Sequence, residues 1–189
     1  MAQALAKMRQ QPQANVYFVA FAGEEAGLLG SEAFAREIVS RSGKLPAECR
    51  PRSASFLRRG GENSGKRQAI IMDEVGWLSD KLPKPTVNLE SYDWTAEEMD
   101  HLASSSWQHN GKALDVVHSS NPFGSDHMSF LRHNVSAVLT INGDDEAYPD
   151  YHSSEDKISN VNATFMHQIA KMNMGALMRM AGVQTATSH

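Results

Sequence analysis

Two adjacent glutamates, Glu24 and Glu25, follow an apolar run that ends at Gly23. The run, residues 15–21, is rich in Val, Phe and Tyr and predicts a buried β-strand, and the residues after it predict a helix over 24–40. Open α/β sheets bind ligands beyond their strand ends, so one carboxylate could bind a metal there while its neighbour acts as a general base on metal-bound water. The alternative is that both residues only favour the start of the helix.

Two further polar positions stand near the ends of predicted strands. Asp73 interrupts a strand predicted over 69–75, and His152 follows a strand predicted over 135–141, in the sequence Tyr-Pro-Asp-Tyr-His-Ser-Ser-Glu-Asp. If these edges converge with the Glu-Glu turn, they bring carboxylates and an imidazole together, and zinc prefers such ligands. Taken singly, Asp73 could cap a turn, and a histidine in a loop is usually just exposed.

The remaining pattern alternates strands with helices. Strands are predicted over 86–89 and 113–118, and helices over 2–10, over 95–110, over 125–131 with Ser125 as cap, and over 160–181. This alternation predicts one domain over residues 1–189, a three-layer α/β/α sandwich around a central, mostly parallel (mixed) sheet. Residues 41–67 hold eight of the eighteen Lys and Arg and predict a basic loop insertion, either a solvated loop or one that steers an acidic substrate.

Composition excludes several classes of function. The formal net charge is −4 with a pI of about 6.0, which gives no general attraction to nucleic acids or anionic membranes. The sequence has no apolar stretch long enough to span a bilayer. Cys49 is the single cysteine, so neither an intrachain disulfide nor a thiolate metal cluster can form. These observations leave the compartment open.

Four segments, residues 18–31, 71–76, 124–130 and 151–156, resemble the co-catalytic zinc aminopeptidases typified by bacterial leucyl aminopeptidase. This family includes glutamate carboxypeptidase-like and glutaminyl cyclase-like relatives. The segments occur in the order that the family has, and the first is specific because it joins a glycine, two acids and a Gly-Leu-Leu-Gly-Ser tail. The resemblance implies hydrolysis of the first peptide bond of a peptide with a free N-terminus. Members are often secreted or held in an endomembrane or periplasmic compartment.

The resemblance also implies a role for each matching residue. Glu24 matches the general base, Glu25 and His152 match ligands of one zinc, and Asp73 matches a ligand of the second zinc. Tyr151 stands where some relatives place a phenol that stabilises the oxyanion.

Three residues near these positions are expected to support them. Asp126 and His127 would line or brace the cleft, or serve only to pack the N-terminus of a helix. Asp156 would orient the His152 ring without itself binding the metal.

Part of the family's metal site is not found in this sequence. The family places a histidine ligand and the aspartate that bridges both metals before the Glu-Glu turn, but the 23 residues before Glu24 contain neither a histidine nor an aspartate. We therefore expect a C-terminal portion of a longer enzyme, with one weak zinc site or none where the family binds two ions. Alone, it should show little peptidase activity and associate through exposed sheet edges.

Two other functions fit the same fold. One is a glutaminyl cyclase-like zinc acyltransferase, which cyclises an N-terminal glutamine. The other is a non-catalytic, receptor-like binding module that has lost its metals. Retention of Glu24, Glu25, Asp73 and His152 argues against the second, because clustered carboxylates repel one another without a cation.

Overall fold

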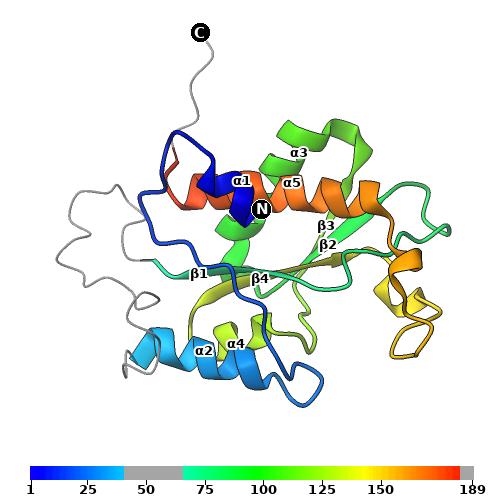
Figure 1. The fold of residues 1–189 in the computed structure, drawn as a ribbon, viewed down its shortest axis with the longest axis horizontal. Helices are drawn as coiled ribbons and strands as arrows, with labels where there is room; N and C mark the ends of the chain where they lie inside the picture. The colour runs from blue at the N-terminus through cyan, green and yellow to red at the C-terminus, as the bar shows by residue number, and fades with distance from the viewer. Residues whose placement is uncertain (41–65, 184–189) are drawn as a thin grey trace, which may run out of the picture.

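The structure is a computed structural model that describes residues 1–40 and 66–183. Figure 1 shows its arrangement around a four-stranded sheet. The helices are α1 (Ala2–Ala6), α2 (Leu29–Ser40), α3 (Ala96–Asn110), α4 (His127–Arg132) and α5 (Ala163–Met180), with short 3-10 turns η3 (Asp93–Thr95), η4 (Gly111–Ala113), η5 (Asp145–Ala147) and η6 (Ile158–Asn160). The strands are β1 (Gln68–Met72), β2 (Thr86–Glu90), β3 (Asp115–Ser119) and β4 (Ser136–Asn142).

The sheet is mixed, in the order β1-β4-β2-β3. Parallel pairs join β1 to β4, with Ile70 opposite Val138, and β2 to β3, with Asn88 opposite Val117. The two pairs meet in an antiparallel contact between β2 and β4. Every residue of β4 is buried, which agrees with its continuous apolar sequence and its central place.

Helices cover both faces of this sheet, with α3 and α5 on one side and α2 and α4 on the other (Figure 1). One buried cluster packs α3 and α5 on the sheet and contains Leu89, Leu102, Phe165, Ile169 and Met172 among its members. A second cluster packs α2 and α4 against the opposite face. The prediction of a three-layer α/β/α sandwich with a mixed sheet is therefore confirmed.

Polar bonds fix the helices within each layer. Between α2 and α4, the Oγ atoms of Ser31 and Ser129 lie 2.8 Å apart. Between α3 and α5, Ser105 Oγ donates to the Met172 carbonyl oxygen at 2.7 Å. A Cβ added to Gly175 would lie 2.2 Å from Ser105 Oγ, so a larger residue at this position would force the side chains between α3 and α5 to move.

The prediction of a strand over residues 15–21 is wrong. The segment is extended, but no strand among the described residues pairs with it, and a strand needs a neighbour to bind its backbone groups. Aromatic packing holds it instead: the Phe21 ring lies 5.7 Å from that of Phe34 and 6.0 Å from that of Phe130. Phe18 and Val19 are 45% and 43% exposed, so the apolar sequence is only partly buried.

The helix predicted over 24–40 begins later, at Leu29, because a turn occupies residues 24–28. Most other elements lie within a few residues of their predicted bounds. Ser125 does not cap α4, since its hydroxyl binds Asp73 and the residue before the helix is Asp126. The predicted helix over 2–10 is the short α1, and most of the predicted basic loop, residues 41–65, lies outside the described residues. Across residues 1–40 and 66–183, no helix has the length and apolar character to cross a membrane.

Candidate active site

The turn that carries Glu24 and Glu25 is fixed by its own backbone. The Glu24 carbonyl oxygen accepts hydrogen bonds from the N–H groups of Gly27, at 2.9 Å, and Leu28, at 2.8 Å. The N–H of Gly30 donates to the Ala22 carbonyl oxygen at 3.0 Å. A Cβ on residue 30 would lie 2.7 Å from that same oxygen, so only glycine allows the chain to fold back this closely. The two acids therefore project from a tight turn rather than from a helix.

Glu25 and His152 meet although they are far apart in the sequence. His152 Nε2 lies 2.7 Å from Glu25 Oε1, and both side chains are more than half exposed. The His152 backbone is left-handed, with φ of 53°, which is uncommon outside glycine, and its ring stacks on that of Tyr151 at 3.8 Å. The structure thus brings together two residues that the resemblance assigns to one zinc.

Asp73 leaves the end of β1 with both carboxylate oxygens bound. Its Oδ1 accepts the N–H of Glu74 at 2.9 Å, and its Oδ2 accepts the hydroxyl of Ser125 at 2.7 Å. Ser125 is almost fully buried just before α4, so it fixes the orientation of the Asp73 carboxylate. Sequence reasoning took Ser125 for a helix cap and missed this contact.

The charges of the other predicted site residues affect the pKa of Glu24. Burial raises the pKa of its carboxyl group, and the negative charges of Asp73, Glu25 and Asp126 raise it further, while His152 acts in the opposite direction. A carboxylate with a raised pKa is a better proton acceptor at neutral pH than an ordinary surface glutamate. The residues predicted from separate segments therefore act electrostatically on the residue predicted as the base.

Tyr151 borders the same group of charges. Partial burial raises the pKa of its phenol first, and the carboxylates of Glu74, Glu25 and Asp73 raise it further. A phenol with a raised pKa keeps its proton at neutral pH and can donate a hydrogen bond.

The three supporting residues have different positions. The Asp126 carboxylate contributes to the raised pKa of Glu24, and its Oδ1 is buried without a hydrogen-bond partner in the part of the chain that is described. His127 is fully buried, and burial lowers its pKa to about 4, so it is neutral at physiological pH. Asp156 does not orient His152 in this structure, because its Oδ1 accepts the Tyr148 hydroxyl at 2.7 Å and His152 contacts Glu25 instead.

Three further acids with a raised pKa were not predicted: Glu74 and Asp145, which follow β1 and β4, and Glu90, which lies in β2 opposite Leu139. Burial raises the pKa of Glu74 to about 7, with added effects from Asp73 and Asp145, and burial raises the pKa of Glu90 to about 7, with an added effect from Asp145. The signal in the sequence was an acid at or just after the end of an apolar strand, as in Ile-Ile-Met-Asp-Glu over residues 70–74.

The donors suit zinc in kind but not in number. Carboxylates and an imidazole are ligands that zinc accepts. Within residues 1–40 and 66–183, however, no group of three His, Cys, Asp or Glu side chains is placed to hold a metal ion. Glu25 and His152 supply two donors, and Asp73 is engaged with Glu74 and Ser125. A catalytic zinc usually needs three protein ligands, so these residues form only part of a metal site.

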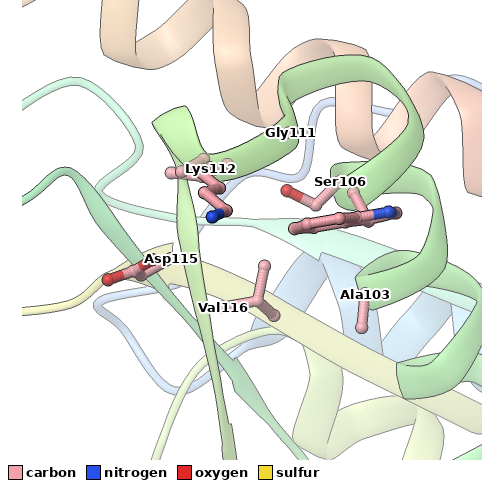
Figure 2. Close-up of a pocket in the computed structure, with 8 residues that line it drawn as sticks. Ala103, Ser106, Gly111, Lys112, Asp115 and Val116 are labelled. Atoms are coloured by element: carbon pink, nitrogen blue, oxygen red, sulfur yellow. The ribbon is translucent and has the colours of Figure 1, made fainter.

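A separate hollow of about 200 Å³ lies between α3, η4 and β3 (Figure 2). Its lining residues are Ala103, Ser106, Trp107, Gly111, Lys112, Leu114, Asp115 and Val116. None of them is a residue that the sequence assigned to chemistry, so the hollow does not belong to the candidate active site.

Comparison with solved structures supports the fold. The chain is similar to the aminopeptidase LapA of Legionella pneumophila, with 20% identity, a TM-score of 0.73, and coverage of 97% of this chain and 44% of LapA. It is similar to BSAP, a zinc aminopeptidase from Bacillus subtilis, with 19% identity, a TM-score of 0.65, and coverage of 96% and 39%. It is also similar to the glutaminyl cyclase of Bacteroides thetaiotaomicron, with 14% identity, a TM-score of 0.52, and coverage of 88% and 50%.

The chain thus spans half or less of the length of these three proteins. No curated protein matches its sequence. Residues 1–177 match the family described as peptidase family M28.

Proposed function

Because the chain belongs to peptidase family M28, we propose that it carries part of the active site of a zinc-dependent aminopeptidase that hydrolyses the N-terminal peptide bond of peptides. The observation that carries the proposal is the 2.7 Å contact between Glu25 and His152, directly beside Glu24. These residues come from separate segments, and each matches a functional position in the resemblance. Their meeting supports a shared site over chance exposure of a loop histidine.

The residues divide into metal ligands and groups that handle protons. Glu25 and His152 would hold one zinc, and Asp73, oriented by Ser125, would help to hold a second. When bound, zinc lowers the pKa of water and polarises a carbonyl group.

Glu24 accepts and returns the proton of the attacking water, since its carboxylate lies in the same turn as Glu25 and its pKa is raised. Tyr151 donates a hydrogen bond from its phenol to the developing oxyanion. Its stacking on His152 fixes that phenol beside the ligand pair.

The incomplete donor set limits what the chain does alone. Residues 1–23 contain no histidine or aspartate, although the resemblance places further ligands before the Glu-Glu turn. We therefore expect weak zinc binding and little turnover from this chain without additional donors.

Zinc titration of the purified chain tests the ligand assignment. Competition against a chromophoric chelator should show weak binding that Glu25→Gln and His152→Asn abolish. Glu155→Gln is the matched control, because Glu155 is exposed and pairs with Lys157. Zinc binding that survives both ligand substitutions would contradict the proposal, and tight stoichiometric binding would contradict the incomplete site.

A glutaminyl cyclase-like activity is the second candidate, and the similarity to a solved glutaminyl cyclase favours keeping it. The two reactions release different products from a glutaminyl peptide. Cyclisation releases ammonia and leaves a lactam ring at the N-terminus of the peptide, whereas hydrolysis releases free glutamine. Mass spectrometry of the products, with Glu24→Gln as the inactive control, separates them.

A further inference from the structure

The loop between β4 and α5 carries Tyr151 and His152 and is drawn in yellow to orange in Figure 1. We call residues 148–160 the site loop. The N–H of Ser153 donates to the Asp150 carbonyl oxygen at 3.1 Å, which closes a turn around His152. His152 is left-handed in this turn, with φ of 53°. That conformation is uncommon for a residue with a side chain, so contacts elsewhere must offset its cost in free energy.

The contacts of the His152 ring are too exposed to hold the turn by themselves. The ring lies against Glu25 and Tyr151, and both of these side chains are more than half exposed. A contact between exposed polar side chains contributes little to stability. Asp156, which was expected to orient the ring, binds Tyr148 instead. The left-handed turn therefore needs support from within the site loop.

The side-chain amide of Asn160 supplies this support. Its Nδ2 donates to Tyr148 Oη at 3.0 Å, to Asp150 Oδ2 at 3.0 Å and to the Glu155 carbonyl oxygen at 2.9 Å. An amide nitrogen carries two hydrogens, so these three acceptors share them. Tyr148 and Asp150 precede His152 in the chain, and Glu155 follows it. One amide group thus joins the two sides of the turn.

Tyr148 connects this amide to the rest of the molecule. Its hydroxyl accepts a hydrogen bond from Asn160 and donates one to Asp156 at 2.7 Å. Its ring packs on that of Trp77, with the ring centres 5.1 Å apart. Trp77 lies in the segment that leaves β1 after Asp73. The site loop is therefore attached to the segment that carries another predicted metal ligand.

We propose that Asn160 is a positioning residue of the site, because its amide holds the site loop in the conformation that presents His152 to Glu25. The amide acts through the backbone of the turn and not on the reacting atoms. A loop without this support would sample many conformations, and the entropy cost of ordering it would reduce the affinity for a metal ion. This inference rests on the proposed function for the role of His152 as a zinc ligand.

Asn160→Asp tests the proposal directly, because it replaces the N–H donors by an oxygen and changes the size of the side chain little. The new carboxylate would face the Asp150 carboxylate and the Glu155 carbonyl oxygen, which repel it, so the turn should open. NMR of the histidine rings in the metal-free full chain measures this. The His152 signal, identified by its loss in His152→Asn, should be displaced by the stacked Tyr151 ring and should move to its position in urea in Asn160→Asp.

Two further variants separate positioning from a general loss of stability. Tyr148→Phe removes one acceptor of the amide and leaves the other two, so the His152 signal should move less than in Asn160→Asp. Asn110→Asp is the matched control, because Asn110 Nδ2 donates to the Gln168 carbonyl oxygen at 3.0 Å, outside the site loop. It should lower the melting temperature without moving the His152 signal. An unmoved signal in Asn160→Asp, or an equal movement in Asn110→Asp, would overturn the proposal.

Zinc binding distinguishes failure of this inference from failure of the proposed function. Asn160→Ala adds no new metal donor and should weaken zinc binding roughly tenfold in the chelator competition, as loss of a group that orients a ligand does. A displaced His152 ring with unchanged zinc affinity would support the role of Asn160 and count against His152 as a ligand. An undisturbed ring, with zinc affinity that still depends on His152, would overturn the positioning role and leave the proposed site intact.

Discussion

The layer formed by α3 and α5 differs from the sheet edge at the ends of β1 and β4, called here the site edge. Each buried polar side chain of the layer has a hydrogen-bond partner, and some buried polar groups at the site edge have none among the described residues. In the layer, Leu102 and Phe165 pack in an apolar cluster, and the buried Ser105 hydroxyl is hydrogen-bonded. At the site edge, Glu74 has a carboxylate oxygen buried without a hydrogen-bond partner among the described residues, and Glu74 and His152 have positive φ angles. Strain and unpaired charge of this kind concentrate at functional sites. Packing in the layer stabilises the fold, and this stability offsets the free-energy cost of the strained and unpaired groups at the site edge.

Loss of an apolar side chain in the layer should have the largest effect. Leu102→Ala removes a fully buried side chain from the cluster and should lower the free energy of unfolding by about 3 kcal/mol. Urea denaturation measures the change. Met166→Ala is the control on α5, because Met166 is 42% exposed, and it should change stability by less than about 0.5 kcal/mol. Equal effects of the two substitutions would remove the distinction between layer and surface.

Gly175→Ala tests how closely the two helices of the layer approach. The new Cβ would meet Ser105 Oγ at 2.2 Å and the His109 ring at 2.8 Å, and this overpacking should cost about 2 kcal/mol. The double variant with Ser105→Ala should recover part of the loss, because it removes the first clash. If the denaturation midpoint of the double variant does not recover, the clash with Ser105 is not the source of the destabilisation.

Glu90→Gln should have the opposite sign, because it removes a charge that is buried in the sheet. The folded pKa of about 7 lies above the ordinary value of 4.5, so between these pH values the folded protein binds more protons than the unfolded chain. The unfolding free energy should therefore fall as pH rises from about 4.5 to about 7. Glutamine removes this loss, but its buried amide also costs free energy, so the net stabilisation at pH 8 should be about 1.5 kcal/mol. Thermal melts from pH 4 to pH 8 measure it, and parallel curves for both proteins would contradict the prediction.

Asn162→Ala should have the smallest effect, at the point where the layer meets the site edge. Asn162 Oδ1 accepts the N–H of Phe165 at 3.0 Å and caps α5, while its own N–H donates to the Gly76 carbonyl oxygen at 2.7 Å. Loss of the cap should cost about 1 kcal/mol, and Asn162→Asp should retain most of the stability. A similar loss in both variants would mean that the side chain does not act as a cap.

The sequence predicted those helices and strands whose own hydrophobic pattern is enough to determine their secondary structure. The strand predicted over 135–141 and the helix predicted over 160–181 agree closely with β4 and α5, because a continuous apolar run and a 3.6-residue period leave few alternatives. Residues 15–21 have an equally strong strand composition, but a strand also needs a paired neighbour, and local composition does not report one. Pairing is a property of the whole fold.

The site shows the same limit. A specific segment around Glu24 and Glu25 and the resemblance to a family pointed to His152, and the structure places His152 against Glu25. The contact between Ser125 and Asp73 was missed, because a serine before a short helix is usually a cap. The raised pKa values of Glu74, Glu90 and Asp145 were missed as well, because they depend on burial in the folded chain, which positions in the sequence do not report.

The central place of β4 also governs the order in which the chain can assemble. β1 pairs with β4, with Gln68 opposite Ser136, and β2 pairs with the same strand, with Glu90 opposite Leu139. A nascent chain that ends before residue 136 therefore holds both partners of β4 without the strand that joins them. Until β4 leaves the ribosome, β1 and β2 expose unpaired edges, and delayed synthesis or early release at that stage would favour aggregation over folding.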